Sequence, residues 1–431
     1  MKILILSCST GGGHNTAARA VKECLELHGH EAVLLDPFSL SGKRTADFVG
    51  NAYIQLAKHA PGFFGFLYRF ADAISSCRRK SPVYYVNRIP ARRLYAYLQE
   101  NPYDAIVMPH LYPAEMVTYL KKKYSDLPPT VAVATDYTCI PFWEETRCDH
   151  YILPHIELLE ENLKKGMSAE NLHPYGIPVG QAFSRHFGKE AAKEKLHLSK
   201  DKPVLLVMSG SMGFGKMHLF VFELTRKLTN GEQLIIICGN NRKTYRILKS
   251  TYRRNANVHI TGYTEHVADY MAASDVVFTK PGGLTSTEAL VRNIPIVHTA
   301  PIPGCETKNR EFFVSRGLSL ASEHVHTQIS QGLTLLHNTE LRNAMITTQQ
   351  KYAKPDAAMQ IVELLLKLTS GRDAADVKKK QNGVFYDLLI LVHRRLSVRQ
   401  CALRLSDPQA ILPCGYPHPQ RRRKSGNRKC L

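Results

Sequence analysis

The alternation of short apolar segments with amphipathic segments constrains the fold of this 431-residue chain more than any other feature. It occurs in two series, with helical patterns such as Asn15–Leu27 and Pro113–Tyr124 between the apolar segments. The β-like segments of the first series are Lys2–Cys8, Glu31–Asp36, Asp104–Pro109, Thr130–Thr135 and His150–Leu153, and those of the second are Pro203–Met208, Gln233–Cys238, Asn257–Ile260, Asp275–Thr279 and Ile294–His298. Such alternation builds parallel sheets with helices on both faces, so the sequence predicts an α/β protein with two Rossmann-like domains.

The two series also set the predicted domain boundaries. Residues 1–175 form the first domain and residues 203–370 the second, which ends with a helix near Asp356–Leu368. Residues 176–202 are rich in Gly, Pro, Lys and Ser and have no strand pattern, so we interpret them as a linker. Residues 371–431 have no sustained periodicity, and we expect this basic tail to be poorly ordered.

The charge is unevenly distributed. The chain has 57 Lys and Arg against 37 Asp and Glu, and its net charge of +20 predicts an anionic partner. Half of this charge lies in the tail, and the segment Lys58–Arg93 carries another +7. The rest of the chain is nearly balanced, so the total charge by itself does not indicate nucleic acid.

Cysteine spacing and hydropathy bear on the compartment. None of the ten cysteines forms a C-x-x-C pair, which favours free thiols in a reducing compartment over a disulfide framework or a zinc site. With 44% hydrophobic residues the chain can bury a core, which excludes wholesale disorder. The N-terminal apolar run stops at Ser7, and no window approaches about 18 consecutive apolar residues, so we expect neither a signal peptide nor a membrane-spanning helix.

The sequence Gly11-Gly12-Gly13-His14 lies between the first strand and the first helix. Glycines let a ligand approach the backbone closely, and a helix N-terminus presents free N–H groups. His14 would lie at the carboxyl edge of a parallel sheet, where open α/β folds bind ligands, and a neutral imidazole can accept a hydroxyl proton. A helix-capping loop with an incidental histidine is the structural alternative.

A second glycine-rich sequence, Ser209-Gly210-Ser211-Met212-Gly213-Phe214-Gly215-Lys216, follows the first strand of the second series. It nearly matches the P-loop pattern G-x-x-x-x-G-K-[ST], but Met217 stands where a hydroxyl must bind Mg²⁺. We therefore interpret it as a turn that presents backbone amides to a phosphate without a metal. A tight strand–helix turn is again the alternative.

A third motif, Lys280-Pro281-Gly282-Gly283-Leu284-Thr285-Ser286-Thr287-Glu288-Ala289, leads from a strand into a helix and predicts an anion site. Thr285 can donate a hydroxyl hydrogen bond, and Glu288 can accept two from a ribose diol, although a capping-box acid has the same placement. Downstream, Glu306 and Asn309 lie three residues apart at a helix start. They share one helix face and suit sugar hydroxyls.

As a set, these motifs resemble glycosyltransferase family 28, in its branch of monogalactosyldiacylglycerol synthases and processive diacylglycerol glucosyltransferases. The resemblance covers about residues 1–369 and rests on Ser-Thr-Gly-Gly-Gly-His, Lys-Pro-Gly-Gly-Leu-Thr-x-x-Glu-Ala and Pro-Gly-x-Glu-x-x-Asn. Supporting sequences are Ala134-Thr135-Asp136-Tyr137 followed by Trp143, Gly176-Ile177-Pro178-Val179, and Gly262-Tyr263-Thr264-Glu265.

The resemblance implies a GT-B architecture, in which two Rossmann-like domains face a cleft and the C-terminal one holds most of a UDP-sugar. It also implies a role for each matching residue. His14 is the general base, with Gly12 and Gly13 beside the donor, while Asp136 lies on the acceptor side. The diphosphate region is held by Ser209, Gly210, Ser211, Met212, Gly213, Gly282, Gly283, Leu284 and Thr285, the uracil by Tyr263, the ribose by Glu288, and the hexose by Glu306 and Asn309.

The implied reaction is the inverting transfer of a hexose from UDP-glucose or UDP-galactose to diacylglycerol. Cys305 stands where related lipid glycosyltransferases commonly have Gln, which leaves the choice of hexose open. The second domain has no Asp-x-Asp motif in a metal-ligand arrangement, and backbone amides with helix N-termini can stabilise a UDP leaving group. We therefore expect no cofactor and no obligatory metal.

The segment Lys58–Arg93 interleaves cations with aromatic residues such as Phe63, Phe66 and Phe70, which suits an anionic bilayer surface. Single-stranded nucleic acid, or a core helix with a solvated basic face, would fit the same pattern. Because the family acts on a membrane lipid, we expect a cytoplasmic protein peripherally bound to the inner face of the cell membrane, with no nucleic-acid partner. A UDP-N-acetylglucosamine-dependent cell-wall lipid-intermediate glycosyltransferase and a basic nucleic-acid-binding protein remain alternative hypotheses.

Overall fold

Two parallel sheets organise the chain. The computed structural model describes residues 1–8, 12–42, 55, 60–76, 79–184, 188–208 and 217–370, so the predicted turn 209–216 and tail 371–431 lie outside the described residues. Both sheets belong to one compact unit, Met1–Arg372. The prediction of two parallel, helix-covered sheets is confirmed.

The first sheet has the strand order β2-β1-β3-β4-β5-β6, with all neighbours parallel. Its strands are β1 (Lys2–Leu6), β2 (Glu31–Leu35), β3 (Ala105–Met108), β4 (Thr130–Val133), β5 (His150–Ile152) and β6 (Leu172–His173). Leu4 of β1 pairs with Val33 on one side and Ile106 on the other. A strand buried on both faces needs a continuous apolar sequence, which explains why β1 is predictable, whereas the two residues of β6 are too few to carry a pattern.

The second sheet has the order β12-β11-β10-β7-β8-β9 and is also parallel throughout. Its strands are β7 (Val204–Met208), β8 (Gln233–Ile237), β9 (Val258–Thr261), β10 (Val276–Thr279), β11 (Ile296–His298) and β12 (Leu320–Ala321). Counted from β7, this is the strand order of nucleotide-binding Rossmann folds, in which successive strands are added on one side of the first strand and then, from the fourth strand on, on its other side.

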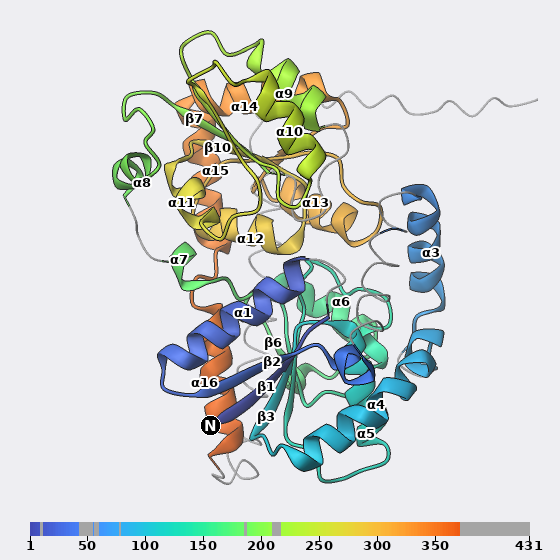
Figure 1. Cartoon of the computed structure of the whole chain (residues 1–431). Helices are drawn as coiled ribbons and strands as arrows, with labels where there is room; N and C mark the ends of the chain where they lie inside the picture. Colours follow the sequence, from blue (N-terminus) through green and yellow to red (C-terminus); the bar gives the residue numbers. More distant parts are fainter. Residues whose placement is uncertain are drawn as a thin grey trace, which may run out of the picture. The chain divides into compact units, whose positions relative to one another are not determined.

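Helices cover both sheets (Figure 1). They are α1 (Gly12–Leu27), α3 (Pro61–Ile74), α4 (Pro82–Glu100), α5 (Leu111–Lys121), α6 (Leu159–Lys164), α7 (Gln181–Ser184), α8 (Lys189–Lys195), α9 (Met217–Thr225), α10 (Arg242–Thr251), α11 (Val267–Ala273), α12 (Gly283–Val291), α13 (Cys305–Ser315), α14 (Val325–His337), α15 (Thr339–Tyr352) and α16 (Ala357–Thr369). Short 3₁₀ segments occur at Pro37–Ser41, Trp143–Glu145, Ile156–Leu158 and Ala169–Asn171. In the described ranges, no helix is both long and apolar enough to cross a membrane.

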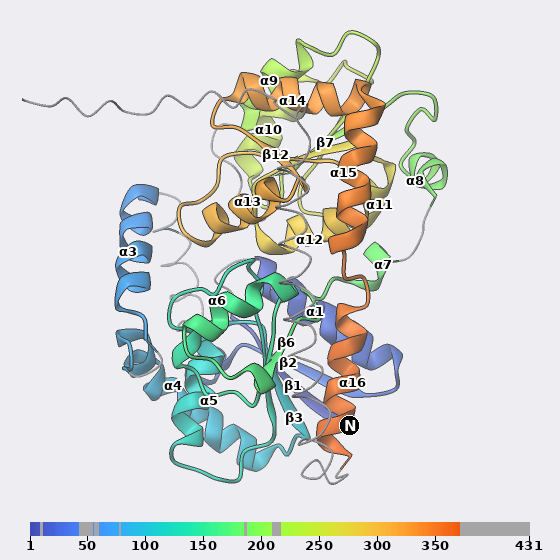
Figure 2. The same ribbon diagram turned by 180° about the vertical axis from the view of Figure 1, so that it is seen from behind.

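Helix α16, the last of the described helices, packs against the first sheet, although the sequence assigns it to the second domain. Ile361, Val362 and Leu365 lie in the same buried cluster as Ile3 and Ile5 of β1. Figures 1 and 2 show α16, coloured orange-red, beside α1 and the strands of the first sheet. Sequence order could not reveal this packing, because an apolar helix face does not specify which sheet it covers.

The predicted linker 176–202 contains helices α7 and α8 and contributes to a core. Ile177, Ala192 and Leu198 are buried in one cluster with Val204 of β7. Gly176, with φ +104°, lies where the chain first leaves the first half. A side chain there would lie 2.5 Å from Cβ of Lys354, in the return connection to α16. The segment that leaves the first sheet at Gly176 and the segment that returns to it at Lys354 are therefore in contact.

Candidate active site

The carboxyl ends of β1 and β3 meet at the switch point of the first sheet. β1 lies between β2 and β3, so the connections that follow β1 and β3 leave the sheet in opposite directions. Ligands of open α/β sheets bind in the crevice at such a point. His14 reaches this crevice from the first turn of α1, and Pro109 and His110 reach it directly after β3.

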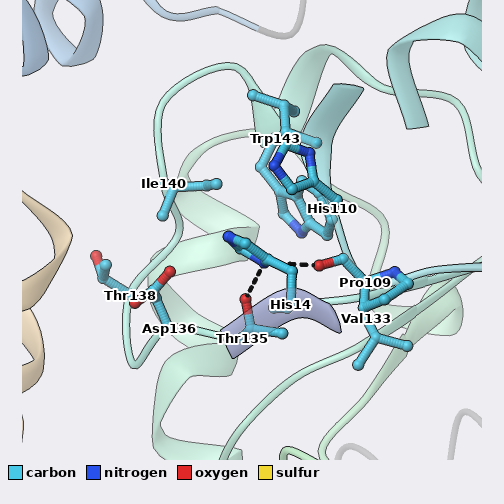
Figure 3. A pocket seen from close by; sticks show the side chains of 11 residues that line it. His14, Pro109, His110, Val133, Thr135, Asp136, Thr138, Ile140 and Trp143 are labelled. Atoms are coloured by element: carbon cyan, nitrogen blue, oxygen red, sulfur yellow. Dashed lines mark hydrogen bonds between the residues drawn. The ribbon is translucent and has the colours of Figure 1, made fainter. Parts of the chain in front are cut away.

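The His14 ring is fixed through one nitrogen. Its Nδ1 lies 2.8 Å from the carbonyl oxygen of Pro109 and 2.8 Å from Oγ1 of Thr135 (Figure 3). A carbonyl oxygen can only accept, so Nδ1 carries the proton of the neutral ring and Nε2 keeps its lone pair. In Figure 3 the free nitrogen lies on the side of Ile140 and Asp136. This is the tautomer that a general base requires.

The pocket around His14 is small and is lined by both polar and apolar residues. Its lining consists of His14, Pro109, His110, Leu111, Val133, Ala134, Thr135, Asp136, Thr138, Ile140 and Trp143. Burial lowers the pKa of His14, while the nearby Asp136 carboxylate and the Pro109 carbonyl oppose that shift. Burial and the neighbouring His14 also lower the pKa of His110, whose ring meets that of His14 edge-on at 4.5 Å. The site therefore holds neutral histidine beside an acidic group.

The second half presents a helix start at its own switch point, between β7 and β10. Gly282 is the N-cap residue of α12, and Gly283 opens the helix. The first turn of a helix leaves N–H groups without helical partners, and such groups suit an anion. Ser286 and Ser319 bond the buried His298 ring, which ties α12 to the neighbouring strand β11. The predicted phosphate-binding residues Ser209, Gly210, Ser211, Met212 and Gly213 lie outside the described residues.

Glu288 lies one turn into α12 and is 5% exposed. Burial raises the pKa of this carboxyl to about 8, and Arg19 of α1 partly opposes the shift. A buried carboxyl with few charged neighbours is costly to ionise unless a ligand donates hydrogen bonds to it. A diol that donates two hydrogen bonds would provide that compensation.

Glu306 is the second residue of α13, and its carboxylate has two partners. Lys280 forms an ion pair with its Oε1, and the N–H of Ile302 donates to its Oε2 at 2.8 Å. A side chain at Gly282 would come within 3.9 Å of the same carboxylate. The start of α12 and the start of α13 therefore lie side by side.

Most of the predicted residues converge. Asn309 donates to Asp136 Oδ1 at 2.8 Å, so a residue of α13 reaches the loop that borders His14. A side chain at Gly13 would come within 3.8 Å of Leu284, which links the starts of α1 and α12. Tyr263 differs from the rest, since it follows the edge strand β9 and is 59% exposed.

Several residues at the site are not among those predicted. Thr135 and Pro109 orient His14, and Lys280 pairs with Glu306. Tyr68 of α3 reaches the loop before α13, where a Cβ on Gly304 would lie 2.9 Å from its ring. Lys280 lies two residues before the glycine pair in the same motif and could have been chosen on that ground. Nothing local marks Tyr68, because the contact joins segments far apart in the chain.

Among the described residues, no group of three or more His, Cys, Asp or Glu side chains is placed to hold a metal ion.

Two Rossmann-type sheets, with a histidine at the switch point of one and a glycine-led helix start at that of the other, give the chain a GT-B architecture. Solved structures agree on the fold. MurG from Acinetobacter baumannii matches with a TM-score of 0.57 at 16% identity, over 85% of this chain and 99% of that one. The Staphylococcus aureus MnaA structure with UDP matches with a TM-score of 0.57 at 15% identity, over 85% of this chain and 96% of that one.

The sequence comparisons are more specific. Residues 14–179 match the monogalactosyldiacylglycerol (MGDG) synthase family, and residues 189–352 match the glycosyl transferases group 1 family. The processive diacylglycerol beta-glucosyltransferase of Staphylococcus saprophyticus is 29% identical over 376 residues, which span 85% of this chain and 93% of that protein. The protein of the same name from Staphylococcus carnosus is 27% identical, over 82% of this chain and 89% of that protein. The chain is therefore similar over most of its length to diacylglycerol glucosyltransferases, and it is a hexosyltransferase, as its motifs predict.

Proposed function

We propose that the protein transfers a hexose from a UDP-sugar to diacylglycerol at a membrane surface, with His14 as the general base. The observation that carries this proposal is the fixed tautomer of His14, whose free Nε2 lies on the side of Asp136 and Ile140 in the pocket (Figure 3). Gly283 at the start of α12 adjoins the Thr135 carbonyl of the same pocket. The relatives named as processive diacylglycerol beta-glucosyltransferases support diacylglycerol as the acceptor and a hexose as the transferred group.

The chemistry follows from this arrangement. Nε2 of His14 accepts the proton of the acceptor hydroxyl as its oxygen attacks the anomeric carbon of the donor. A new C–O bond forms on one face of that carbon while the bond to the UDP phosphate oxygen breaks on the other, so the configuration inverts to a β-glycoside. Asp136 stabilises the imidazolium that forms, and the free N–H groups at the start of α12 stabilise the charge on the departing UDP.

The donor would lie along the second half. In this proposal the amides of Gly282 and Gly283, with Leu284 and Thr285, hold the diphosphate, and Glu288 binds the ribose. Glu306, held by Lys280, receives hexose hydroxyls. Tyr263 stacks near the uracil, where its exposed ring is free to move onto the base.

The acceptor would enter from a membrane that contacts α3 and α4. On α3, Phe63, Phe66 and Phe70 are each 55% exposed, and their spacing places them on one face of the helix. On α4, Val86 and Ile89 are 67% and 77% exposed, and the neighbouring Arg69, Arg79, Arg88, Arg92 and Arg93 are also exposed. Figures 1 and 2 both show α3 at the outer edge of the chain. An apolar face bordered by cations suits insertion into an anionic interface. Lys58 and Arg78 of the predicted segment lie outside the described residues.

The reaction is tested with purified protein, diacylglycerol vesicles and each of UDP-glucose, UDP-galactose and UDP-N-acetylglucosamine, with the glycolipids separated by thin-layer chromatography. We expect product from one of the two hexose donors. Product from UDP-N-acetylglucosamine alone would contradict the proposal and favour the cell-wall type of reaction. His14→Ala should lower turnover at least 100-fold, because a general base contributes about 10²–10⁴. His28→Ala, which alters an exposed histidine just beyond the other end of α1, is the matched control.

The membrane surface is tested by flotation with vesicles that contain phosphatidylglycerol. Burying one phenylalanine side chain contributes about 1.5–3 kcal/mol, so the double variant Phe66→Asp, Phe70→Asp should lower binding more than tenfold. Phe222→Asp changes a similarly exposed phenylalanine on α9 and should leave flotation unchanged. Equal effects of the two variants would count against the proposed face.

A further inference from the structure

Tyr137 belongs to the first half of the chain, but its side chain is buried in the second. It follows β4 and is 5% exposed. Its ring lies 4.8 Å from that of Phe312 and 4.9 Å from that of Phe313, both on α13. Its hydroxyl lies 2.9 Å from Oγ1 of Thr287 on α12. Thr287 donates its own proton to the Gly283 carbonyl, so Tyr137 is the donor in this pair. The tyrosine thus anchors the β4 loop to both helices of the donor side.

The Asn309 side-chain amide completes this connection. Its oxygen accepts the N–H of Tyr137 at 2.6 Å, and its NH₂ donates to Asp136 Oδ1 at 2.8 Å and to the Pro281 carbonyl at 3.1 Å. Asn309 is fully buried, and both of its donors are used. One amide therefore joins α13, the loop before α12 and the loop after β4.

The two halves approach each other closely at the same place. A Cβ on Gly283 would lie 1.9 Å from the carbonyl oxygen of Thr135. No side chain fits between them, so the contact exists only because position 283 is glycine. The loop 135–137 is consequently fixed at its backbone, at the Tyr137 ring and at the Asp136 carboxylate.

We propose that Asn309 is a positioning residue for the reaction, which holds the Asp136 carboxylate beside His14 when the two halves are closed. This inference rests on the proposed function and assigns Asn309 a task other than contact with the hexose. Further titratable groups of the described residues lie close to the pair. His110 faces His14, and the Cys305 thiol and the Tyr68 phenol lie near Asp136.

The physical consequence concerns the strength of the base. Asp136 raises the pKa of His14 against the effect of burial. Without the amide of Asn309, the carboxylate loses its charge-assisted hydrogen bond and can turn toward water, where its effect on the ring is screened. His14 then becomes a weaker base with a lower pKa, and the imidazolium formed during transfer is less stable. Both changes slow the chemical step.

The test compares Asn309→Ala with Gln349→Ala. Gln349 is also fully buried in the second half, and its amide makes two backbone bonds, to Ile294 and Leu318. Both variants should lose stability. We expect only Asn309→Ala to lower kcat about 10-fold or more and to move the acid limb of the kcat/KM profile to lower pH by at least half a unit. UDP affinity should stay within about threefold, because in this inference Asn309 acts on His14 through Asp136 and does not contact UDP.

A second readout does not need turnover. Trp143 is the only tryptophan of the chain, and it lines the pocket with His14. Protonated imidazole quenches indole fluorescence, so a pH titration of Trp143 emission reports protonation of His14, with His14→Asn as the reference. The midpoint should be lower in Asn309→Ala than in the wild type. If Asn309→Ala does not fold, Thr287→Val loosens the same connection without removing the amide and should move the midpoint in the same direction.

The outcomes separate the two proposals. An unchanged acid limb and an unchanged Trp143 midpoint in Asn309→Ala, with a raised KM for the UDP-sugar, would mean that Asn309 serves the hexose and would overturn the inference. Identical pH profiles for all variants would overturn it as well. Undiminished turnover of His14→Ala would instead count against the proposed function.

Discussion

Replacing Gly283 by alanine tests how closely the two halves must approach for transfer to occur. The added methyl would lie 1.9 Å from the Thr135 carbonyl oxygen. A carbon and a carbonyl oxygen approach to about 3.3 Å, so the 135–137 loop must retreat by about 1.4 Å. Gly283 opens α12 with ordinary helical geometry, so alanine is acceptable to the backbone itself and the effect is confined to this contact.

The size of this loop movement determines the expected loss in kcat/KM. The bonds from Asn309 to Tyr137 and Asp136, now 2.6 Å and 2.8 Å, would lengthen to about 4 Å, beyond hydrogen-bond range. A neutral bond contributes about 1 kcal/mol and a bond to a charged group about 1.5–3 kcal/mol, so the closed arrangement loses about 2.5–4 kcal/mol. That loss corresponds to a fall in kcat/KM of between about 70-fold and 900-fold.

The assay is steady-state transfer to diacylglycerol vesicles, with UDP affinity measured by calorimetry. UDP affinity should fall far less than turnover, because the Thr135 contact concerns closure. Gly188→Ala adds a methyl where nothing lies within 4 Å and should behave as the wild type. Gly332→Ala places a Cβ 2.1 Å from the Phe278 ring, so it should lower the melting temperature without the loss in kcat/KM per folded molecule. A kcat/KM for Gly283→Ala within threefold of the wild type would refute the reasoning.

Three further predictions follow from buried groups and backbone geometry. UDP should bind up to about tenfold more tightly per pH unit as pH rises toward 8. The reason is that the complex needs Glu288 ionised, whereas the pKa of Glu288 in the free protein is about 8. Calorimetry should show that UDP binding to Glu288→Gln lacks this pH dependence. Burial and Glu145 raise the pKa of Glu115 to about 9, so its contribution to stability is lost as pH rises from about 4.5 toward 9. The melting temperature of Glu115→Gln relative to that of the wild type should therefore be higher at pH 8 than at pH 5. An equal difference in melting temperature at both pH values would exclude this cause. Gly176→Ala should lower the melting temperature more than Gly317→Ala does, since both positions have positive φ but only Gly176 has a neighbour within 4 Å of the added methyl.

The strands and helix starts were accessible to sequence reasoning because their signals are local. β1 through β5 and β7 through β11 coincide with apolar segments predicted to within a few residues. β6 and β12 have two residues each and escape any periodic pattern. The placement of α16 on the first sheet and the packed state of residues 176–202 also escaped prediction, since an apolar face is visible in sequence whereas its partner is not.

The candidate site divides in the same way. The sequence by itself determined two parallel sheets, a histidine at one switch point and a glycine-led helix start at the other. These features are predictable because apolar segments and glycine motifs are short, contiguous stretches of sequence. The tertiary structure alone decided that Pro109 and Thr135, 95 and 121 residues from His14, fix its tautomer. It alone decided that Asn309, 173 residues from Asp136, bonds that carboxylate. Hydrogen bonds act over about 3 Å, so they depend on how the chain folds back on itself and leave no periodic trace in the sequence.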